Sequence, residues 1–267
     1  MKTQFIYRFA VAVMLMTAAG NLAAQEIEGG TVKYQQTTRY DFSAMFGGRD
    51  NPRANNPRMK ERLASLPKES TTVKVLYFTE EEALCEDDPA ANEALPRNLQ
   101  HMLAIANYMK LPSPDLSKVY YNFRKNKKIE QVEFMTRDFL VSNKIERKAW
   151  KLTNKNTRIL GYTCMGAELK KEDQTITAWF TSEIPFSVGP DEFIGLPGLI
   201  LAVEIDGETA FLATSIDLTP PTEGLLVKPD AGKKVTRKKF DKIIAEKIKE
   251  YEETKGEDPD RRRRRRR

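Results

Sequence analysis

The sequence offers few combinations of a catalytic nucleophile with a base beside it. The chain has one histidine, His101, and two cysteines, Cys85 and Cys164. A Ser-His-Asp or Cys-His site needs a base beside the nucleophile, so either arrangement would have to use His101. Cys164 lies in the apolar stretch GYTCMGA, which is typical of a buried strand. The sequence therefore singles out no catalytic residue, and we expect a non-catalytic protein.

Motifs for binding metals and phosphates are also missing from the sequence. It contains no HExxH, no CxxC and no pair of histidines at helical spacing. The acidic clusters EEEALCEDD (80–88) and GEDPD (256–260) lack the regular glycine and oxygen pattern of a calcium loop, so we interpret them as solvated loops. GGRDN (47–51) has neither the spacing nor the lysine of a phosphate-binding loop. We expect no metal and no cofactor.

The first 24 residues have the layout of a secretory signal. Lys2 and Arg8 precede an apolar core that is too short to span a bilayer, and Leu22-Ala23-Ala24 provides a cleavage site with small residues. No later segment is apolar enough to cross a membrane. We expect three parts: a signal peptide (1–24), a single domain (25–255) and a disordered tail (256–267). The exported protein would be periplasmic or secreted.

The net charge of +6 comes from the ends of the chain. The signal holds two of the 44 basic residues and no acid, and the tail holds a run of seven arginines from Arg261 to Arg267. Without the signal and this run of arginines, 35 basic side chains face 38 acidic ones, so the domain itself is not basic. The arginine run could contact an anionic surface, or it could be a solvated end without a partner. Nucleic acid is not an expected partner of an exported protein.

An even number of cysteines in an exported protein suggests a disulfide. A bridge between Cys85 and Cys164 would close a loop of roughly 80 residues and stabilise the fold by on the order of 4 kcal/mol. The alternative is two unpaired thiols, of which one is buried and inert. We expect the bridge.

Segments with alternating apolar residues dominate the pattern and predict strands. They include GTVKYQQTTRYDF (30–42), TTVKVLYF (71–78) and a series of short runs from residue 119 to residue 218, separated by turns such as RKNKK, TNKNTR, KKEDQ and DGE. Helical spacing is seen at 95–109 and 236–253, and a short helix is expected before Pro67. The predicted fold is α+β and β-rich: one domain built on a curved antiparallel meander sheet, with two or three helices packed against it.

The second half of the chain contains several distinctive short motifs: GYTC (161–164), AWF (178–180), IP (184–185), GP (189–190) and the string GLPGLI (195–200). In this combination it resembles the GLPGLI family of exported Bacteroidota proteins. It implies an exported, β-rich envelope protein. The family has no established reaction, so the resemblance assigns no catalytic residue.

The aromatic residues of this region allow two interpretations. In the first, they are core residues on neighbouring strands. In the second, they line the mouth of a ligand cavity in the curved sheet; the candidate ligand-binding residues are then Trp150, Trp179, Phe193, Leu196, Pro197 and Gly198. We expect a non-catalytic binding protein, an accessory to outer-membrane transport or assembly whose partner is an envelope protein or another outer-membrane component. The alternatives are a carrier of a lipid-like or other apolar ligand, and an unrecognised hydrolase.

The run FIGLPGLIL (193–201) has neither charged nor hydroxyl side chains. Pro197-Gly198 suits a type II turn, because Pro fixes φ at the second position and Gly supplies a positive φ at the third. The apolar residues 199–203 do not alternate with polar ones, which predicts a strand that is covered on both faces. The run is therefore expected to be a bend that leads the chain into the centre of the sheet.

Overall fold

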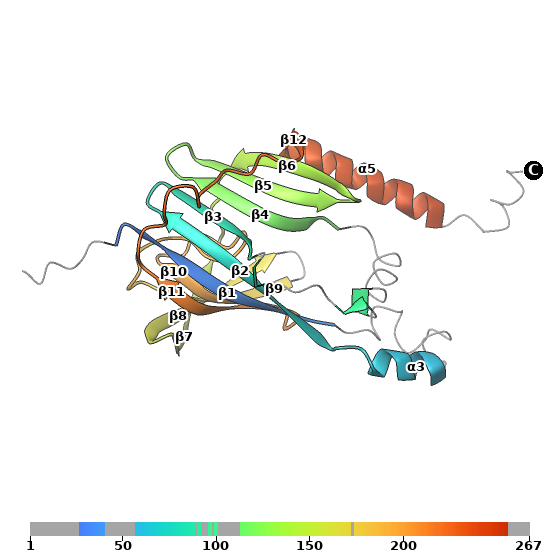
Figure 1. Cartoon of the computed structure of the whole chain (residues 1–267), viewed down its shortest axis with the longest axis horizontal. Helices are drawn as coiled ribbons and strands as arrows, with labels where there is room; N and C mark the ends of the chain where they lie inside the picture. The colour runs from blue at the N-terminus through green and yellow to red at the C-terminus, as the bar shows by residue number, and fades with distance from the viewer. Residues whose placement is uncertain are drawn as a thin grey trace, which may run out of the picture.

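A computed structural model describes residues 27–40, 57–88, 90–91, 96–97, 99–100, 113–171 and 174–255 of the chain. One sheet of 12 strands makes up most of this part (Figure 1). The strands are β1 (Gly29–Arg39), β2 (Glu69–Thr79), β3 (Glu82–Asp87), β4 (Asp115–Asn122), β5 (Lys127–Phe134), β6 (Arg137–Lys144), β7 (Lys151–Ile159), β8 (Tyr162–Lys171), β9 (Gln174–Thr181), β10 (Leu199–Ile205), β11 (Thr209–Asp217) and β12 (Lys233–Thr236). The helices are α3 (Pro57–Ala64) and α5 (Arg237–Lys255). The prediction of a β-rich fold is confirmed.

The strand order combines two antiparallel meanders. Strands β1 to β6 are neighbours in chain order, and so are β7 to β11. The two sets meet where β1 pairs with β11, which gives the order β12-β6-β5-β4-β3-β2-β1-β11-β10-β9-β8-β7. The added strand β12 pairs with β6 in parallel, unlike the two meanders. The antiparallel meander predicted from the turn pattern is therefore present, with one parallel strand at its edge.

The sheet is open and strongly curved. Its end strands are β12 and β7. Tyr121 on β4 and Cys164 on β8 belong to the same hydrophobic cluster, although six strands lie between β4 and β8 in the sheet. In Figure 1, strands β4 to β6 and strands β7 and β8 accordingly lie on opposite sides of β1 and β2. The accumulated twist of neighbouring strands produces such curvature, and the concave side encloses the core.

One central strand lies in a segment that was predicted to be an acidic loop, and that prediction is wrong. β3 pairs with β2 and β4, and its Ala83, Leu84 and Cys85 are buried. The acidic residues lie around this short apolar stretch, and Glu86 forms an ion pair with Lys118 of β4 at 2.5 Å. Three buried residues between acids are too few for a clear alternating pattern.

The β7–β8 hairpin also differs from the prediction. TNKNTR was expected to be a turn, but it lies within β7, an edge strand that is exposed over most of its length. The turn is formed by Leu160 and Gly161, whose φ angles are 51° and 88°. Two consecutive positive φ angles are typical of a tight type I′ hairpin. Because neither face of β7 is buried, its sequence has no apolar alternation.

The described helices differ in how they contact the sheet. Phe240 of α5 is fully buried, and its ring lies 6.2 Å from that of Phe134 and 5.1 Å from that of Phe139. The predicted C-terminal helix with Phe240 on its apolar face is confirmed. α3 lies beyond the end of β2 (Figure 1), so one described helix, and not two or three, packs against the sheet. Most of the predicted helix at 95–109, including His101, falls outside the described residues.

The predicted signal peptide (1–24) and arginine tail also fall outside the described residues. Neither α3 nor α5 is long and apolar enough to cross a membrane.

Candidate functional site

The connection between β9 and β10, here called the inner loop (residues 182–198), packs inside the curved sheet. Its Ile184, Phe186, Val188 and Ile194 belong to the same core cluster as inward-facing residues of β1 to β4, β8, β10 and β11. Phe186 contacts Phe78 of β2, with ring centroids 4.8 Å apart. The chain itself therefore fills the space that the sheet encloses.

Backbone hydrogen bonds hold the inner loop against β10. Leu199 N donates to Ile184 O at 3.0 Å, and Ile200 N donates to Val188 O at 2.9 Å. The buried hydroxyl of Tyr34, on β1, donates to Ile200 O at 2.7 Å. Residues 199–203 are buried on both faces of β10, as their sequence predicted.

The bend at Pro197-Gly198 is tighter than the predicted type II turn. Gly198 N donates to Leu196 O at 2.8 Å, which makes a three-residue turn, and Leu199 N is used in the bond to the inner loop. Gly198 has a φ of 150°, and a Cβ there would lie 2.0 Å from Thr181 O. This position therefore requires glycine because the backbone of β9 approaches it closely.

A buried charge fastens the inner loop to the centre of the sheet. Lys74 of β2 is 4% exposed, and its Nζ lies 2.9 Å from Asp191 of the inner loop and 3.0 Å from Asp87 of β3. Burial alone would lower the pKa of Lys74, but the two carboxylates hold this pKa above its ordinary value. Lys74 therefore keeps its charge, and the contacts with both carboxylates offset the cost of burying it.

Both cysteines are buried free thiols in the structure, where the sequence led us to expect a disulfide. Cys85 Sγ accepts a hydrogen bond from Asp191 N at 3.2 Å, and Cys164 Sγ donates to Tyr162 O at 3.6 Å. Burial raises the pKa of Cys85 to about 12, and it also raises the pKa of Cys164. A thiol with so high a pKa is a poor nucleophile at neutral pH.

The candidate ligand residues from the sequence mostly lie in the core. They are Trp150, Trp179, Phe193, Leu196, Pro197 and Gly198. Trp150 Nε1 donates to Ile194 O at 2.9 Å, and its ring lies 6.5 Å from that of buried Phe193. Trp179 is half-buried against the main core cluster, whereas Pro197 is exposed. The structure thus brings Trp150 and Phe193 together as packing residues.

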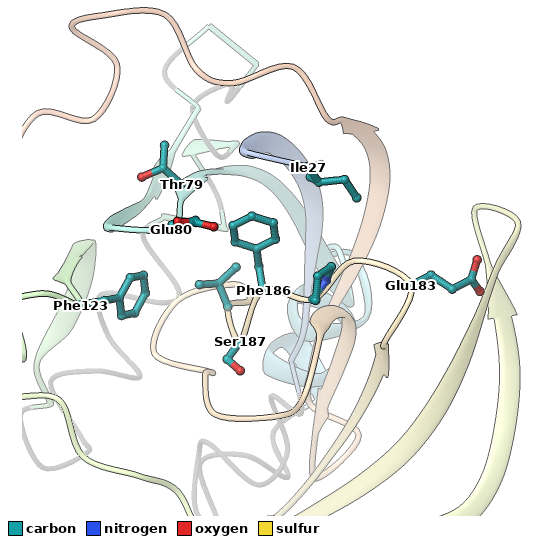
Figure 2. A pocket seen from close by; sticks show the side chains of 9 residues that line it. Ile27, Thr79, Glu80, Phe123, Glu183, Phe186 and Ser187 are labelled. Atoms are coloured by element: carbon teal, nitrogen blue, oxygen red, sulfur yellow. The ribbon is translucent and has the colours of Figure 1, made fainter. Parts of the chain in front are cut away.

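A cavity of about 590 Å³ lies where the inner loop reaches the edge of the core (Figure 2). Its lining is Ile27, Thr79, Glu80, Phe123, Glu183, Pro185, Phe186, Ser187 and Val188. None of these residues was predicted as a site residue. They come from the residues before β1, the end of β2 and the β2–β3 turn, the β4–β5 turn and the inner loop, and no local motif joins such distant segments. We call this cavity the mouth cavity.

The polar groups of the mouth cavity are not arranged as a catalytic pair. Glu183 extends away from the aromatic lining (Figure 2), and its Oε1 accepts a hydrogen bond from Thr163 N at 2.9 Å. Thr79 Oγ1 accepts bonds from two backbone amides of the β2–β3 turn, so its hydroxyl closes that turn. Glu80 supplies an exposed carboxylate beside the apolar lining. Within the described ranges, no three His, Cys, Asp or Glu side chains are grouped so that they could hold a metal ion.

Comparisons with known proteins give one family match, over the inner loop and its flanking strands, and two distant structural neighbours. A family model described as "Protein of unknown function (Porph_ging)" matches residues 168–202, from the end of β8 into β10. No curated protein matches the sequence at a significant level. Two solved structures of PNGF-II, in C2 and P21 space groups, align with TM-scores of 0.49 and 0.48 at 14% and 16% identity. Both alignments cover 81% of this chain but only 32% and 33% of PNGF-II, so this chain spans about a third of that protein's length.

Proposed function

We propose that the protein is an exported envelope protein of the GLPGLI type that acts by binding, as an accessory to an outer-membrane transport or assembly system. The signal pattern of residues 1–24 supports export. The family-model match over residues 168–202, which contain the string GLPGLI, supports the family assignment.

The observation that carries this proposal is the mouth cavity. The inner loop fills the space that the sheet encloses, so a ligand would bind in this cavity at the edge of the core. Phe123, Phe186 and Val188 offer an apolar surface to a ligand from outside, and Glu80 adds a carboxylate beside it. Apolar pockets with a few polar groups are typical of binding sites. The occupant that fits is a segment of an envelope protein that presents an aliphatic or aromatic side chain next to a basic one.

A carrier of a lipid-like ligand is the second candidate, because the same apolar lining would suit an acyl chain. Such a ligand could not lie within the sheet unless it displaced Ile184, Phe186 and Val188 from the core cluster. It would therefore have to bind in the mouth cavity. An unrecognised hydrolase that used Cys164 or Cys85 as its nucleophile gains no support, because both thiols are buried and burial raises the pKa of each.

The experiment is an affinity pull-down from membranes of the natural host with wild-type protein and two variants. Phe123→Ser removes a half-buried ring from the mouth cavity. Leu160→Ser removes an exposed apolar side chain, 47% exposed, at the β7–β8 turn and is the matched control. A benzophenone amino acid at position 123 then tests direct contact by photo-crosslinking.

We expect a specific envelope protein to be retained by wild type and by Leu160→Ser, to be lost with Phe123→Ser, and to crosslink at position 123. Circular dichroism checks that both variants are folded. Equal retention by both variants, or no retained protein at all, would refute binding through the mouth cavity. Native mass spectrometry that shows a lipid on wild type, lost in Phe123→Ser, would favour the carrier instead.

A further inference from the structure

A second cavity, of about 500 Å³, has a charged lining and no part in the proposal above. It lies between β4, β5, β6, the chain before β7, the end of β8, the inner loop and the start of α5. Lys128, Lys148, Lys171 and Arg237 line it, together with the carboxylate of Glu192. Lysine and arginine side chains from four separate parts of the chain therefore bring positive charge to one place.

The cations of this cavity share their carboxylates. Glu192 lies 3.4 Å from Lys148 Nζ and 3.1 Å from Lys171 Nζ. Glu130 likewise pairs with Lys128 at 2.9 Å and with Arg237. Four cations thus share two carboxylates.

The remaining charges around this cavity do not cancel the excess. Asp241 gives Arg237 a second, longer contact at 3.7 Å. Glu146 accepts a hydrogen bond from Asn143, and Arg147 supplies a fifth cation. Five cations therefore face four carboxylates, so one positive charge remains in excess.

Tyr121 provides an independent sign of a ligand. Its side chain is 2% exposed, it lines this cavity, and its hydroxyl has no hydrogen-bond partner among the described residues. Buried hydroxyls nearly always have a partner, because an unpaired one is costly. Tyr34, the comparable buried tyrosine of β1, does donate, to Ile200 O. The Tyr121 hydroxyl is therefore an unpaired donor in the wall of the cavity, and a bound group reaches it by displacing the side chains that shield it.

We propose that this cavity binds a small molecule through a phosphomonoester group, with the Tyr121 hydroxyl donating to a phosphate oxygen and Lys171, Lys148, Lys128 and Arg237 compensating its charge. A phosphomonoester is a dianion that accepts several hydrogen bonds, which suits a cavity where lysine and arginine side chains outnumber the carboxylates. The cavity volume suits a metabolite of about the size of a sugar phosphate. The phosphate could belong to a soluble metabolite or to a lipid headgroup.

The test is calorimetric titration of the protein with glucose 6-phosphate, with glucose as the uncharged control, and with phosphatidylcholine vesicles that contain or lack phosphatidic acid. Tyr121→Phe removes only the unpaired hydroxyl. Lys171→Met removes a cation that lies 3.1 Å from Glu192. Lys155→Met is the matched control, because Lys155 on the neighbouring strand β7 also pairs with a carboxylate, Glu168 at 3.5 Å, but lies outside the cavity.

We expect wild type to bind one of the two phosphate probes, and glucose not at all. Tyr121→Phe should weaken binding about fivefold and Lys171→Met about tenfold, while Lys155→Met should leave it unchanged. The probe that binds identifies the source of the phosphate. Failure of both probes at about 10 mM phosphate, or equal binding by all three variants, would overturn the proposal. This cavity shares no lining residue with the mouth cavity. Neither outcome of the titration therefore bears on the proposed binding through the mouth cavity, which the pull-down tests.

Discussion

The ammonium group of Lys74 lies 2.9 Å from the carboxylate of Asp191, and the lysine side chain is only 5% exposed. This ion pair joins the centre of the sheet to the inner loop. Asp191 N also donates to Cys85 Sγ, so the same residue contacts both β2 and β3. The position of the inner loop therefore depends on a charge that is largely shielded from water.

Removal of the Asp191 carboxylate should destabilise the fold strongly. In Asp191→Ala the buried charge of Lys74 keeps only Asp87 as a partner, and loss of one member of a buried pair typically costs about 3 kcal/mol or more. Urea unfolding measures the change. The control is Lys155→Ala, which breaks an exposed pair with Glu168 and should change the free energy of unfolding by no more than about 0.5 kcal/mol. Similar losses in both variants would show that the buried pair is not special.

The free energy of unfolding should fall on acidification, because Glu192 becomes protonated. Burial alone would raise the pKa of this carboxyl, but Lys148 and Lys171 lower it from 4.5 to about 2. Because the folded state lowers this pKa, the stabilisation is present above pH 4.5 and is lost as the pH falls towards 2. Wild type should lose on the order of 2 kcal/mol in this window through Glu192 alone.

The variant Glu192→Gln should lack this part of the pH dependence. Its deficit relative to wild type should be largest near neutral pH and should shrink towards pH 2 in urea unfolding. Glu208→Gln, at an exposed position in the β10–β11 turn, should follow the wild-type curve. A deficit of Glu192→Gln that does not change with pH would contradict this assignment.

Two glycines of the GLPGLI string should respond very differently to alanine. In Gly198→Ala the new Cβ meets Thr181 O at 2.0 Å, so the backbone has to move, and we expect a loss of about 4 kcal/mol or failure to fold. In Gly195→Ala the nearest heavy atom is Lys148 N at 3.9 Å, so only the positive φ of 93° is strained, at about 1 to 2 kcal/mol. Thermal unfolding of the pair measures the difference. Equal losses of stability in the two variants would mean that the close approach of β9 is not the reason why position 198 requires glycine.

The two thiols should be unreactive in the folded protein. Cys85, with a pKa of about 12, and buried Cys164 should not react with Ellman's reagent near neutral pH, and both should react after denaturation without reductant. Cys85→Ser should leave one thiol in the same assay. No free thiol in the denatured wild type would instead demonstrate the disulfide that the sequence suggested.

The parts of the fold that could be predicted from the sequence are those with a local pattern. Alternating apolar residues predicted most strands, and the spacing around Phe240 predicted α5. β3 was missed because its buried core, Ala83 to Cys85, is flanked by acids. β12 is only four residues long, and β7 is exposed on both faces, so neither has a distinctive pattern.

The candidate sites were hard to predict for a different reason. Their residues come together only when the sheet curls, as Phe123 and Phe186 do in the mouth cavity. The unpaired hydroxyl of Tyr121 and the shared carboxylate of Glu192 are properties of the packed core that spacing along the chain does not encode. The sequence did indicate that FIGLPGLIL is structural, and most of that run is buried.

The pairing of β1 with β11 has a consequence for the time at which the protein can fold. Thr31 of β1 lies opposite Asp217, so the first described strand obtains one of its two neighbours from β11, the last but one strand along the chain. Pairings between residues so far apart in sequence close large loops and form slowly. This central ladder therefore stays unformed until β11 is available, when nearly the whole chain is present. The topology itself delays completion of the sheet, because the last meander must form before β1 obtains its second neighbour.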